Sequence, residues 1–227
     1  MLNDLKIDSR DDVVEFAPGR GLTTKMVLKR HPRSYTAIER DAGSQQKIQE
    51  ILNASGQGRC VVGKAEETGL PDECATVIFG EAMLTMQTQK TKLRIVQEAF
   101  RLLKPGGRYG IHETCLSDNA VSEEKKDEIE KALKKALRVG ARPLLSTEWK
   151  DLLEKAGFSA QQDFQAPMRL LSPKRLIQDE GLFGAMRFVS RVLRSPGAHQ
   201  RIHKIRGTFG KYGNYINSAV LVAEKPS

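Results

Sequence analysis

Cysteine is scarce in this chain, and long apolar runs are missing. Its three cysteines, Cys60, Cys74 and Cys115, stand far apart, in none of the spacings used by metal sites or disulfide frameworks. No stretch approaches the ~20 apolar residues of a membrane-spanning helix, and the polar start of the chain lacks the apolar core of a signal peptide. These absences predict a cytoplasmic protein with no metal site and no transmembrane segment.

Internal repeats and low-complexity tracts are also missing, and the composition is that of an ordinary globular chain. With 227 residues, 39% of them hydrophobic and 29% charged, the chain is expected to form a single domain over residues 1–227. Charge is unevenly distributed, because residues 164–227 carry 11 Lys and Arg against 3 Asp and Glu, while residues 1–163 are nearly balanced. This excess suits an anionic substrate, nucleic acid or a membrane surface, or is only a solvated helix face. It includes Arg187, Arg191, Arg194, Arg201, Lys204 and Arg206.

Hydrophobic periodicity alternates between short apolar strands and amphipathic helices. This alternation predicts an α/β fold, a Rossmann-like, doubly wound and mostly parallel seven-stranded sheet whose last strand is antiparallel. The expected strands are Val13–Ala17, Ser34–Glu39, Arg59–Val62, Ala75–Gly80, Arg108–Glu113, Ser159–Pro167 and Tyr215–Glu224.

Several helices are indicated by apolar residues at helical spacing. One precedes the strand at Arg108 and ends at the turn Pro105–Gly107, and a second covers Glu148–Ala156 with Ser146 or Thr147 as its cap. The segment from Ser122 to Arg138 is rich in charged residues and has one apolar side, which is the pattern of a helix in an inserted lid. The apolar stripe of Leu182–Leu193 suits a lid, a membrane-surface helix or core. Gly207–Tyr215 is expected to be a glycine-rich loop.

The segment Val13–Gly21, V-V-E-F-A-P-G-R-G, is an apolar run that ends in a glycine turn before a helical stretch. Such a turn forms a nucleotide-binding crevice, because backbone there approaches the ligand closely and free N–H groups face it. A dinucleotide fingerprint has a third small residue after the two glycines, whereas this chain has Thr24. Glu15 lies inside the expected strand, where its carboxylate suits the ammonium group of a bound ligand. An amino-acid-bearing nucleotide therefore fits better than NAD.

Five segments in order give the chain a family resemblance. They are Val13–Gly21, Y-T-A-I-E-R-D at Tyr35–Asp41, G-K-A-E-E-T-G-L-P at Gly63–Pro71, A-T-V-I-F-G-E-A-M-L-T-M at Ala75–Met86, and F-R-L-L-K-P-G-G-R-Y-G-I at Phe100–Ile111. Together they resemble the class I, Rossmann-like S-adenosylmethionine-dependent methyltransferases, and within them the small-molecule branch of the ubiquinone and menaquinone type. The resemblance implies S-adenosyl-L-methionine as cofactor and S-adenosyl-L-homocysteine as its product.

The resemblance also implies which residues hold the cofactor. Its methionine portion would lie against Ala17, Gly19 and Gly21, with Glu15 directed toward its amino group. Glu39, followed by Arg40, ends the second strand about 20 residues after the glycine turn, where a carboxylate accepts both ribose hydroxyls. Lys64 stands where the family more often has an acidic residue that binds adenine. Adenine would therefore be met by Glu66 or by backbone alone, at Ala65 and Glu66. Glu81 and Met83 would line the sulfonium.

Two residues are candidates for catalysis, Glu81 and His112. A carboxylate is attracted to a sulfonium, and a histidine near the end of the fifth strand can act as a general base near neutral pH. Each has a structural alternative, a strand-end carboxylate or a hydrogen-bonded core histidine. The implied reaction is direct displacement, in which the acceptor attacks the activated methyl group. His199 and His203 share a helical spacing, but no acidic or cysteine partner accompanies them, so no metal is predicted.

The expected acceptor is a small organic molecule, anionic or apolar. Nucleic acid is disfavoured because the fourth strand is followed neither by an N-P-P-Y-like turn nor by a Pro-Cys pair. Lids are expected from insertions at about 115–145 and 170–214, or from a second subunit in a homodimer. Two alternative functions remain open: an RNA methyltransferase that uses the basic C-terminal quarter, and a non-catalytic interaction protein that binds the cofactor.

Overall fold

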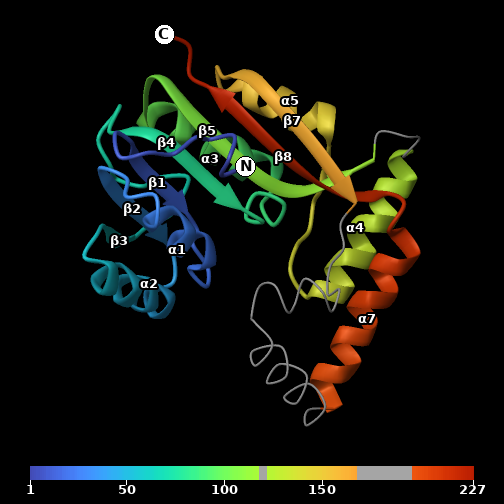
Figure 1. Ribbon diagram of the computed structural model, residues 1–227. Coiled ribbons are helices and arrows are strands. Elements are labelled where there is room, and N and C mark those ends of the chain that lie inside the picture. The colour runs from blue at the N-terminus through green and yellow to red at the C-terminus, as the bar shows by residue number, and fades with distance from the viewer. Residues whose placement is uncertain (118–121, 168–195) are drawn as a thin grey trace.

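The computed structural model shows one twisted sheet with helices on both faces (Figure 1). It describes residues 1–117, 122–167 and 196–227. The strand order is β3-β2-β1-β4-β5-β8-β7, with the two-residue strand β6 paired to β5. The strand bounds are β1 Asp12–Phe16, β2 Ser34–Glu39, β3 Arg59–Val62, β4 Ala75–Glu81, β5 Leu103–Leu116, β6 Leu144–Leu145, β7 Ser159–Pro167 and β8 Ile216–Glu224.

The topology confirms the predicted fold class. β1 to β5 run parallel to one another, and β8 is antiparallel to both of its neighbours, β5 and β7. The main path has the expected seven strands, and β6 is an eighth that the sequence did not predict. Parallel pairing aligns the carboxyl ends of β1 to β5 along one edge of the sheet, where doubly wound folds bind their ligands.

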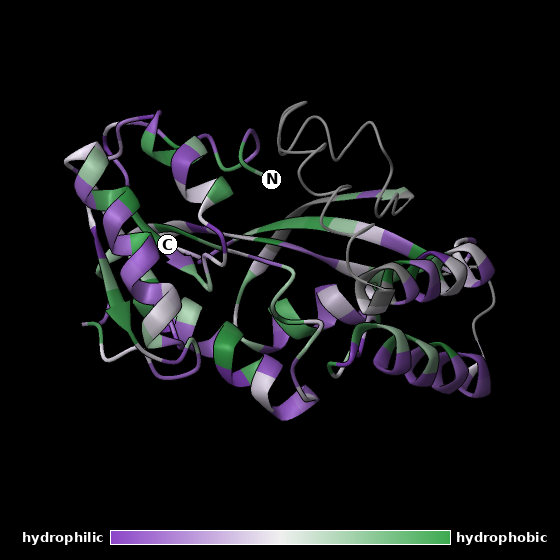
Figure 2. Cartoon of the chain, turned by 90° about the horizontal axis from the view of Figure 1, so that it is seen from below, coloured by the Kyte–Doolittle hydropathy of each residue, from purple (hydrophilic) through white to green (hydrophobic). Residues whose placement is uncertain are grey.

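The described helices are α1 Leu22–Leu28, α2 Ala42–Ser55, α3 Gln89–Leu102, α4 Glu123–Leu137, α5 Ser146–Lys155 and α7 Pro196–Tyr212. Helices α1 and α2 cover one face of the sheet, where Val27 and Leu52 join a core cluster. Helices α3 and α5 cover the other face through residues such as Val96 and Trp149. The helices in Figure 2 accordingly carry hydrophilic and hydrophobic bands, as packing by one face requires.

Three local predictions need correction. β5 begins at Leu103, not Arg108, and its pairing with β4 shifts register across the Pro105–Gly107 segment. Helix α5 already starts at Ser146, so neither Ser146 nor Thr147 caps it, and the Glu148 carboxylate instead accepts the Leu145 N–H at 2.8 Å. Gly207–Tyr212 belongs to helix α7, not to a loop.

The predicted lids fall partly on described residues. Within the first, about 115–145, β5 continues to Leu116, Ser122 caps α4, and β6 occupies Leu144–Leu145. Of the second, about 170–214, α7 is described, whereas Leu182–Leu193 and its arginines lie outside the described residues. None of the helices in the described ranges has the length and apolar character needed to cross a bilayer.

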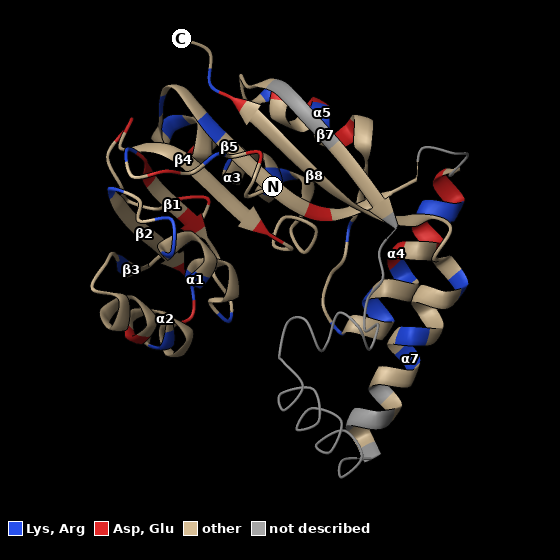
Figure 3. Cartoon of the chain, in the orientation of Figure 1, with Lys and Arg blue, Asp and Glu red and all other residues tan. Residues whose placement is uncertain are grey.

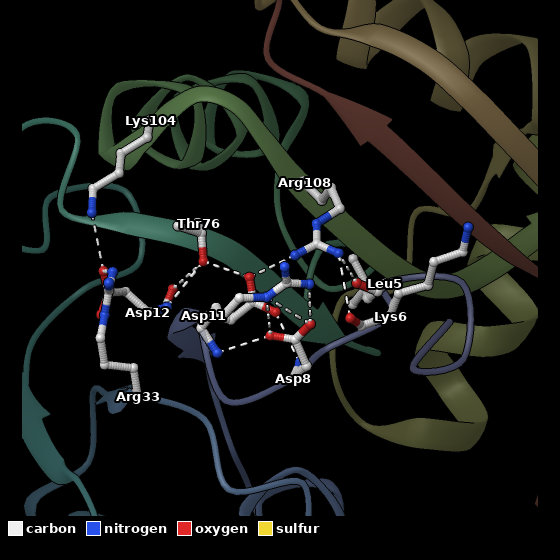
Figure 4. Close-up of polar contacts among 10 residues, drawn as sticks. Leu5, Lys6, Asp8, Asp11, Asp12, Arg33, Thr76, Lys104 and Arg108 are labelled. Atoms are coloured by element: carbon white, nitrogen blue, oxygen red, sulfur yellow. Dashed lines mark hydrogen bonds and ion pairs between the residues drawn. The ribbon is translucent and has the colours of Figure 1, made fainter.

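An ionic cluster fastens the start of the chain to the amino ends of the strands (Figure 4). Asp11 accepts hydrogen bonds from Arg108 at 2.6 Å and from the Thr76 hydroxyl at 2.8 Å, which joins β4 and β5 to the segment before β1. Asp12 pairs with Arg33 and with Lys104, and the arginine holds the pKa of Asp12 well below its usual range. The cluster lies opposite the carboxyl ends of β1 to β5, at the other edge of the sheet.

Lys92 is a fully buried lysine in α3. Its ammonium group donates to the Arg142 carbonyl at 2.5 Å and lies 5.2 Å from the centre of the Trp149 ring. Burial lowers the pKa of Lys92 to about 8, although the carboxylates of Glu113, Glu130 and Glu148 partly oppose this shift. The contact ties α3 to the segment that leads into α5.

We expect Lys92 to make the protein more stable as pH rises from about 8 to 10.5. In this window the unfolded chain binds a proton that the folded chain has released, so unfolding becomes less favourable, by up to about 1.4 kcal/mol per pH unit. Urea unfolding at a series of pH values measures the slope. Lys92→Met should remove it, and an equal slope in that variant would show that another group is responsible.

Candidate crevice at the carboxyl edge of the sheet

The predicted site residues follow the carboxyl ends of adjacent strands. The glycine turn follows β1, Glu39 ends β2 with Arg40 directly after it, Ala65 and Glu66 come after β3, and Glu81 ends β4. His112 lies on β5 directly opposite Glu81 in the parallel register. The fold therefore brings residues that are distant in sequence to a single edge.

The turn after β1 has the left-handed backbone that glycine favours. Ala17, Gly19 and Gly21 have φ values of 53°, 56° and 71°. A Cβ on Gly21 would lie 2.6 Å from the Ile51 side chain, so this glycine lets α1 approach α2. A Cβ on Gly19 would meet only the Ala17 carbonyl, at 3.9 Å, so backbone at Gly19 is open to a ligand.

Glu15 is buried beneath α1 and is 3% exposed. Its carboxylate accepts a hydrogen bond from the Thr24 hydroxyl at 2.5 Å and another from the Tyr35 hydroxyl. Burial raises the pKa of Glu15 to about 7, against the opposing effect of the two hydroxyls. Neither Thr24 nor Tyr35 was singled out in advance as its partner, since they come from α1 and β2. The role of Glu15 toward a cofactor amino group stays a prediction.

Glu39 is half-buried at the end of β2, and its Oε1 accepts the Asp41 N–H at 2.9 Å. Asp41 in turn caps α2, accepting the Ser44 N–H at 2.7 Å. The Ser44 N–H and, to a lesser extent, the positive charge of the exposed Arg40 lower the pKa of Asp41. Because Oε2 makes no hydrogen bond in the described part of the chain, Glu39 keeps acceptor capacity for a ligand.

The segment after β3 supplies a small apolar wall and a carboxylate. Ala65 is 8% exposed and belongs to the core cluster beneath α3, whereas Glu66 is half-buried. A bridge between Lys64 and Glu67 closes this turn. Ala65 and Glu66 thus lie two strands away from the glycine turn, on the same edge of the sheet.

Glu81 and His112 form the one ionisable pair among the predicted catalytic residues. Glu81 Oε2 lies 3.9 Å from His112 Nδ1, and the two side chains are 36% and 29% exposed. The Ala82 N–H donates to the His112 carbonyl at 2.8 Å, which fixes the two strand ends together. The pair thus brings a carboxylate and an imidazole, two groups able to accept a proton, to the same end of the sheet.

Glu113 is a residue of this region that the sequence analysis missed. It is 1% exposed, and its two oxygens accept the N–H groups of Met83, Leu84 and Thr85 at 2.9, 2.8 and 3.0 Å. The Thr85 hydroxyl donates a fourth bond at 2.7 Å. Burial raises the pKa of Glu113, while these donors oppose the shift. Glu113 therefore holds the loop after β4, including Met83, in place.

The comparisons with known proteins agree with this architecture. Residues 13–107 match the methyltransferase domain family. An uncharacterised protein of Haemophilus influenzae is 31% identical over 191 residues, which cover 83% of this chain and 74% of that protein. A protein of Galdieria sulphuraria assigned as a sarcosine dimethylglycine methyltransferase superposes with a TM-score of 0.76 at 14% identity, over 99% of this chain and 81% of that one.

A geranyl diphosphate methyltransferase in complex with S-adenosylmethionine has the same fold, with a TM-score of 0.68 at 12% identity, over 96% of this chain and 79% of that one. Residues 13–107 thus form a methyltransferase domain, and the chain has the fold of the S-adenosylmethionine-dependent methyltransferases. Its methyltransferase domain match contains the glycine turn, Glu39, Ala65, Glu66 and Glu81. The narrower resemblance to ubiquinone and menaquinone methyltransferases stays a prediction.

Proposed function

We propose that this protein binds S-adenosylmethionine in the crevice and transfers its methyl group to a small organic acceptor. The observation that carries the proposal is the combination of an open glycine turn at Gly19 with a free acceptor atom on Glu39, at the ends of adjacent parallel strands. The first suits the amino-acid portion of the cofactor, and the second suits its ribose.

In this proposal each residue of the crevice has a defined task. Backbone at Ala17, Gly19 and Gly21 surrounds the methionine portion, and Glu15 lies beneath it as a counter-charge for the amino group. When bound, the cofactor supplies a methyl group activated by a positively charged sulfur. The chain's own contribution is to hold the acceptor in line with that methyl group and to exclude water, which can account for much of the acceleration.

Glu81 and His112 complete the proposed reaction. Glu81 places negative charge at the mouth of the crevice, and His112 removes a proton from an acceptor that must lose one, an effect of about 10²–10⁴-fold. Their separation of 3.9 Å allows a direct or water-bridged contact once a substrate is bound. An acceptor without an acidic proton would need only alignment.

Calorimetric titration tests the binding step. S-adenosylmethionine and S-adenosylhomocysteine should bind with micromolar affinity, and NAD, the control ligand, should not bind. Acceptors are then screened by release of S-adenosylhomocysteine. Absence of binding by both sulfur nucleotides would overturn the proposal and leave the fold as a non-catalytic interaction module.

A further inference from the structure

Helices α4 and α7 pack side by side and antiparallel at the crevice edge of the sheet (Figure 1). This pair is here called the hairpin, although the two helices are not consecutive in sequence. α4 follows the carboxyl end of β5, and α7 precedes β8, which pairs antiparallel with β5. The root of the hairpin is joined through Glu128, whose carboxylate accepts from Lys125, Lys211 and the Tyr212 hydroxyl at 2.5, 3.0 and 2.6 Å. At this root, positive charge is neutralised by a carboxylate.

Positive charge is left without carboxylates toward the other end of the hairpin. The acidic residues of α4 all precede Lys131, and α7 contains none. Four exposed cations, here called the basic stripe, follow in the last turns of α4 and at its C-cap: Lys131, Lys134, Lys135 and Arg138. None has an ion-pair partner among the described residues, whereas Lys125 and Lys126 near the root are paired. In Figure 3 the ribbons of α4 and α7 carry several blue segments, which mark Lys and Arg.

The spacing of the basic stripe places its charges on one face. Intervals of three and four residues place Lys131, Lys134 and Lys135 on the side of α4 opposite the buried Leu133 and Ala136, and Arg138 follows at the C-cap. The stripe is about 10 Å long, close to the Debye length at physiological salt, so the four charges act together on a partner. Antiparallel packing brings exposed Lys204 of α7 to the level of Lys135.

Exposed apolar side chains adjoin the end of the stripe. Val139, directly after Arg138, is 45% exposed, and Met86 in the loop after β4 is also 45% exposed. The two segments are close, because a Cβ on Gly140 would lie 3.8 Å from the Met86 carbonyl. The described aromatic residues of the hairpin, in contrast, are not exposed, since Tyr212, Phe209 and Tyr215 pack in its core. It therefore offers no stacking platform for single-stranded bases.

We propose that the basic stripe docks the protein on an anionic phospholipid surface, with Val139 and Met86 at the interface. Lysine and arginine near such a surface each contribute about 1 kcal/mol, and an adjacent apolar side chain adds burial in the headgroup region. Docking in this orientation turns the rim of the crevice toward the bilayer. If the proposed function is correct, an apolar acceptor can then enter from the lipid phase. Surface binding itself does not depend on methyl transfer.

Vesicle co-sedimentation tests the proposal with the full chain. The protein should bind vesicles of phosphatidylcholine containing about one-third phosphatidylglycerol, should not bind phosphatidylcholine alone, and should be released by high salt. The triple variant Lys131→Glu, Lys134→Glu and Lys135→Glu should bind at least about 100-fold more weakly, about fivefold for each lysine lost. Equal binding to neutral vesicles, or an unchanged triple variant, would overturn the proposal.

A matched control separates the effect of the basic stripe on vesicle binding from the effect of net charge. Lys25, Lys29 and Lys47 are exposed lysines of α1, its C-cap and α2, and their replacement by Glu makes the same change in charge elsewhere. This control should retain most of the vesicle binding, and a loss equal to that of the stripe variant contradicts a specific surface. A Lys→Gln triple at the stripe, checked by circular dichroism, excludes loss of folding. Binding of duplex or single-stranded RNA in preference to anionic vesicles would overturn the assignment of the partner.

Discussion

Replacing Glu113 by Ala should lower the free energy of unfolding by about 4 kcal/mol. The change leaves the N–H groups of Met83, Leu84 and Thr85 without their acceptor in a buried site, and each buried unsatisfied donor costs about 1–3 kcal/mol. Water entering the space partly offsets this cost. Urea unfolding followed by circular dichroism measures the difference.

Glu113→Gln is the matched control. Its amide oxygen still accepts the Met83 and Leu84 N–H groups, but its NH₂ group faces the donors of Thr85, so a smaller loss of about 2 kcal/mol is expected. Thr85→Val removes the bond that the hydroxyl donates to Glu113 and the longer one that it accepts from the Thr114 N–H, and should cost about 1 kcal/mol. If Glu113→Ala unfolded at the same urea concentration as the wild-type protein, the loop after β4 would not depend on this carboxylate.

Replacing Glu39 by Ala should weaken S-adenosylmethionine binding about 100-fold. A carboxylate that accepts both ribose hydroxyls makes two charge-assisted hydrogen bonds, which contribute about 1.5–3 kcal/mol each before the cost of desolvating the carboxylate is subtracted. Titration calorimetry at fixed pH and salt measures the affinity. Glu39→Gln keeps the shape of the side chain but not its charge, so its affinity should lie between those of the wild-type protein and Glu39→Ala.

Glu39 also accepts the Asp41 N–H, so an effect on local structure must be separated from an effect on the ribose. Asp41→Ala removes the N-cap of α2 and leaves Glu39 in place, which makes it a suitable comparison. It should lower stability by about 1 kcal/mol and change the affinity much less than Glu39→Ala does. Equal losses of affinity in the two variants would assign Glu39 a structural role at the start of α2.

The sheet and its crevice were predictable because their signals are local. Each strand from β1 to β4 contains a short apolar run, followed within a few residues by glycine or a charged residue, and parallel pairing then brings the ends to one edge. Ala17 occupies a left-handed position where the family has glycine, so the motif was recognisable although one residue departs from it.

Other features depend on distant parts of the chain and gave weak signals. Gly207, Gly210 and Gly213 favoured a loop, but the first two lie in α7, where packing against α4 outweighs their low helix propensity. β6 has only two residues and exists because β5 extends to Leu116. Glu113 was visible as a carboxylate in an apolar strand, yet its partners lie 28 to 30 residues earlier. The basic stripe was hidden because α4 as a whole is rich in acidic residues.

The place of β8 has a consequence for biosynthesis. β8 lies between β5 and β7, and β7 has no other strand partner among the described residues. Because a ribosome delivers the chain from its amino end, β5 leaves the exit tunnel with an unpaired edge, and β7 follows with nothing to pair with. Neither β5 nor β7 can form its pairing with β8 until Ile216–Glu224 has been translated. During that interval the nascent protein presents an open apolar edge, and it is then that chaperones are most needed.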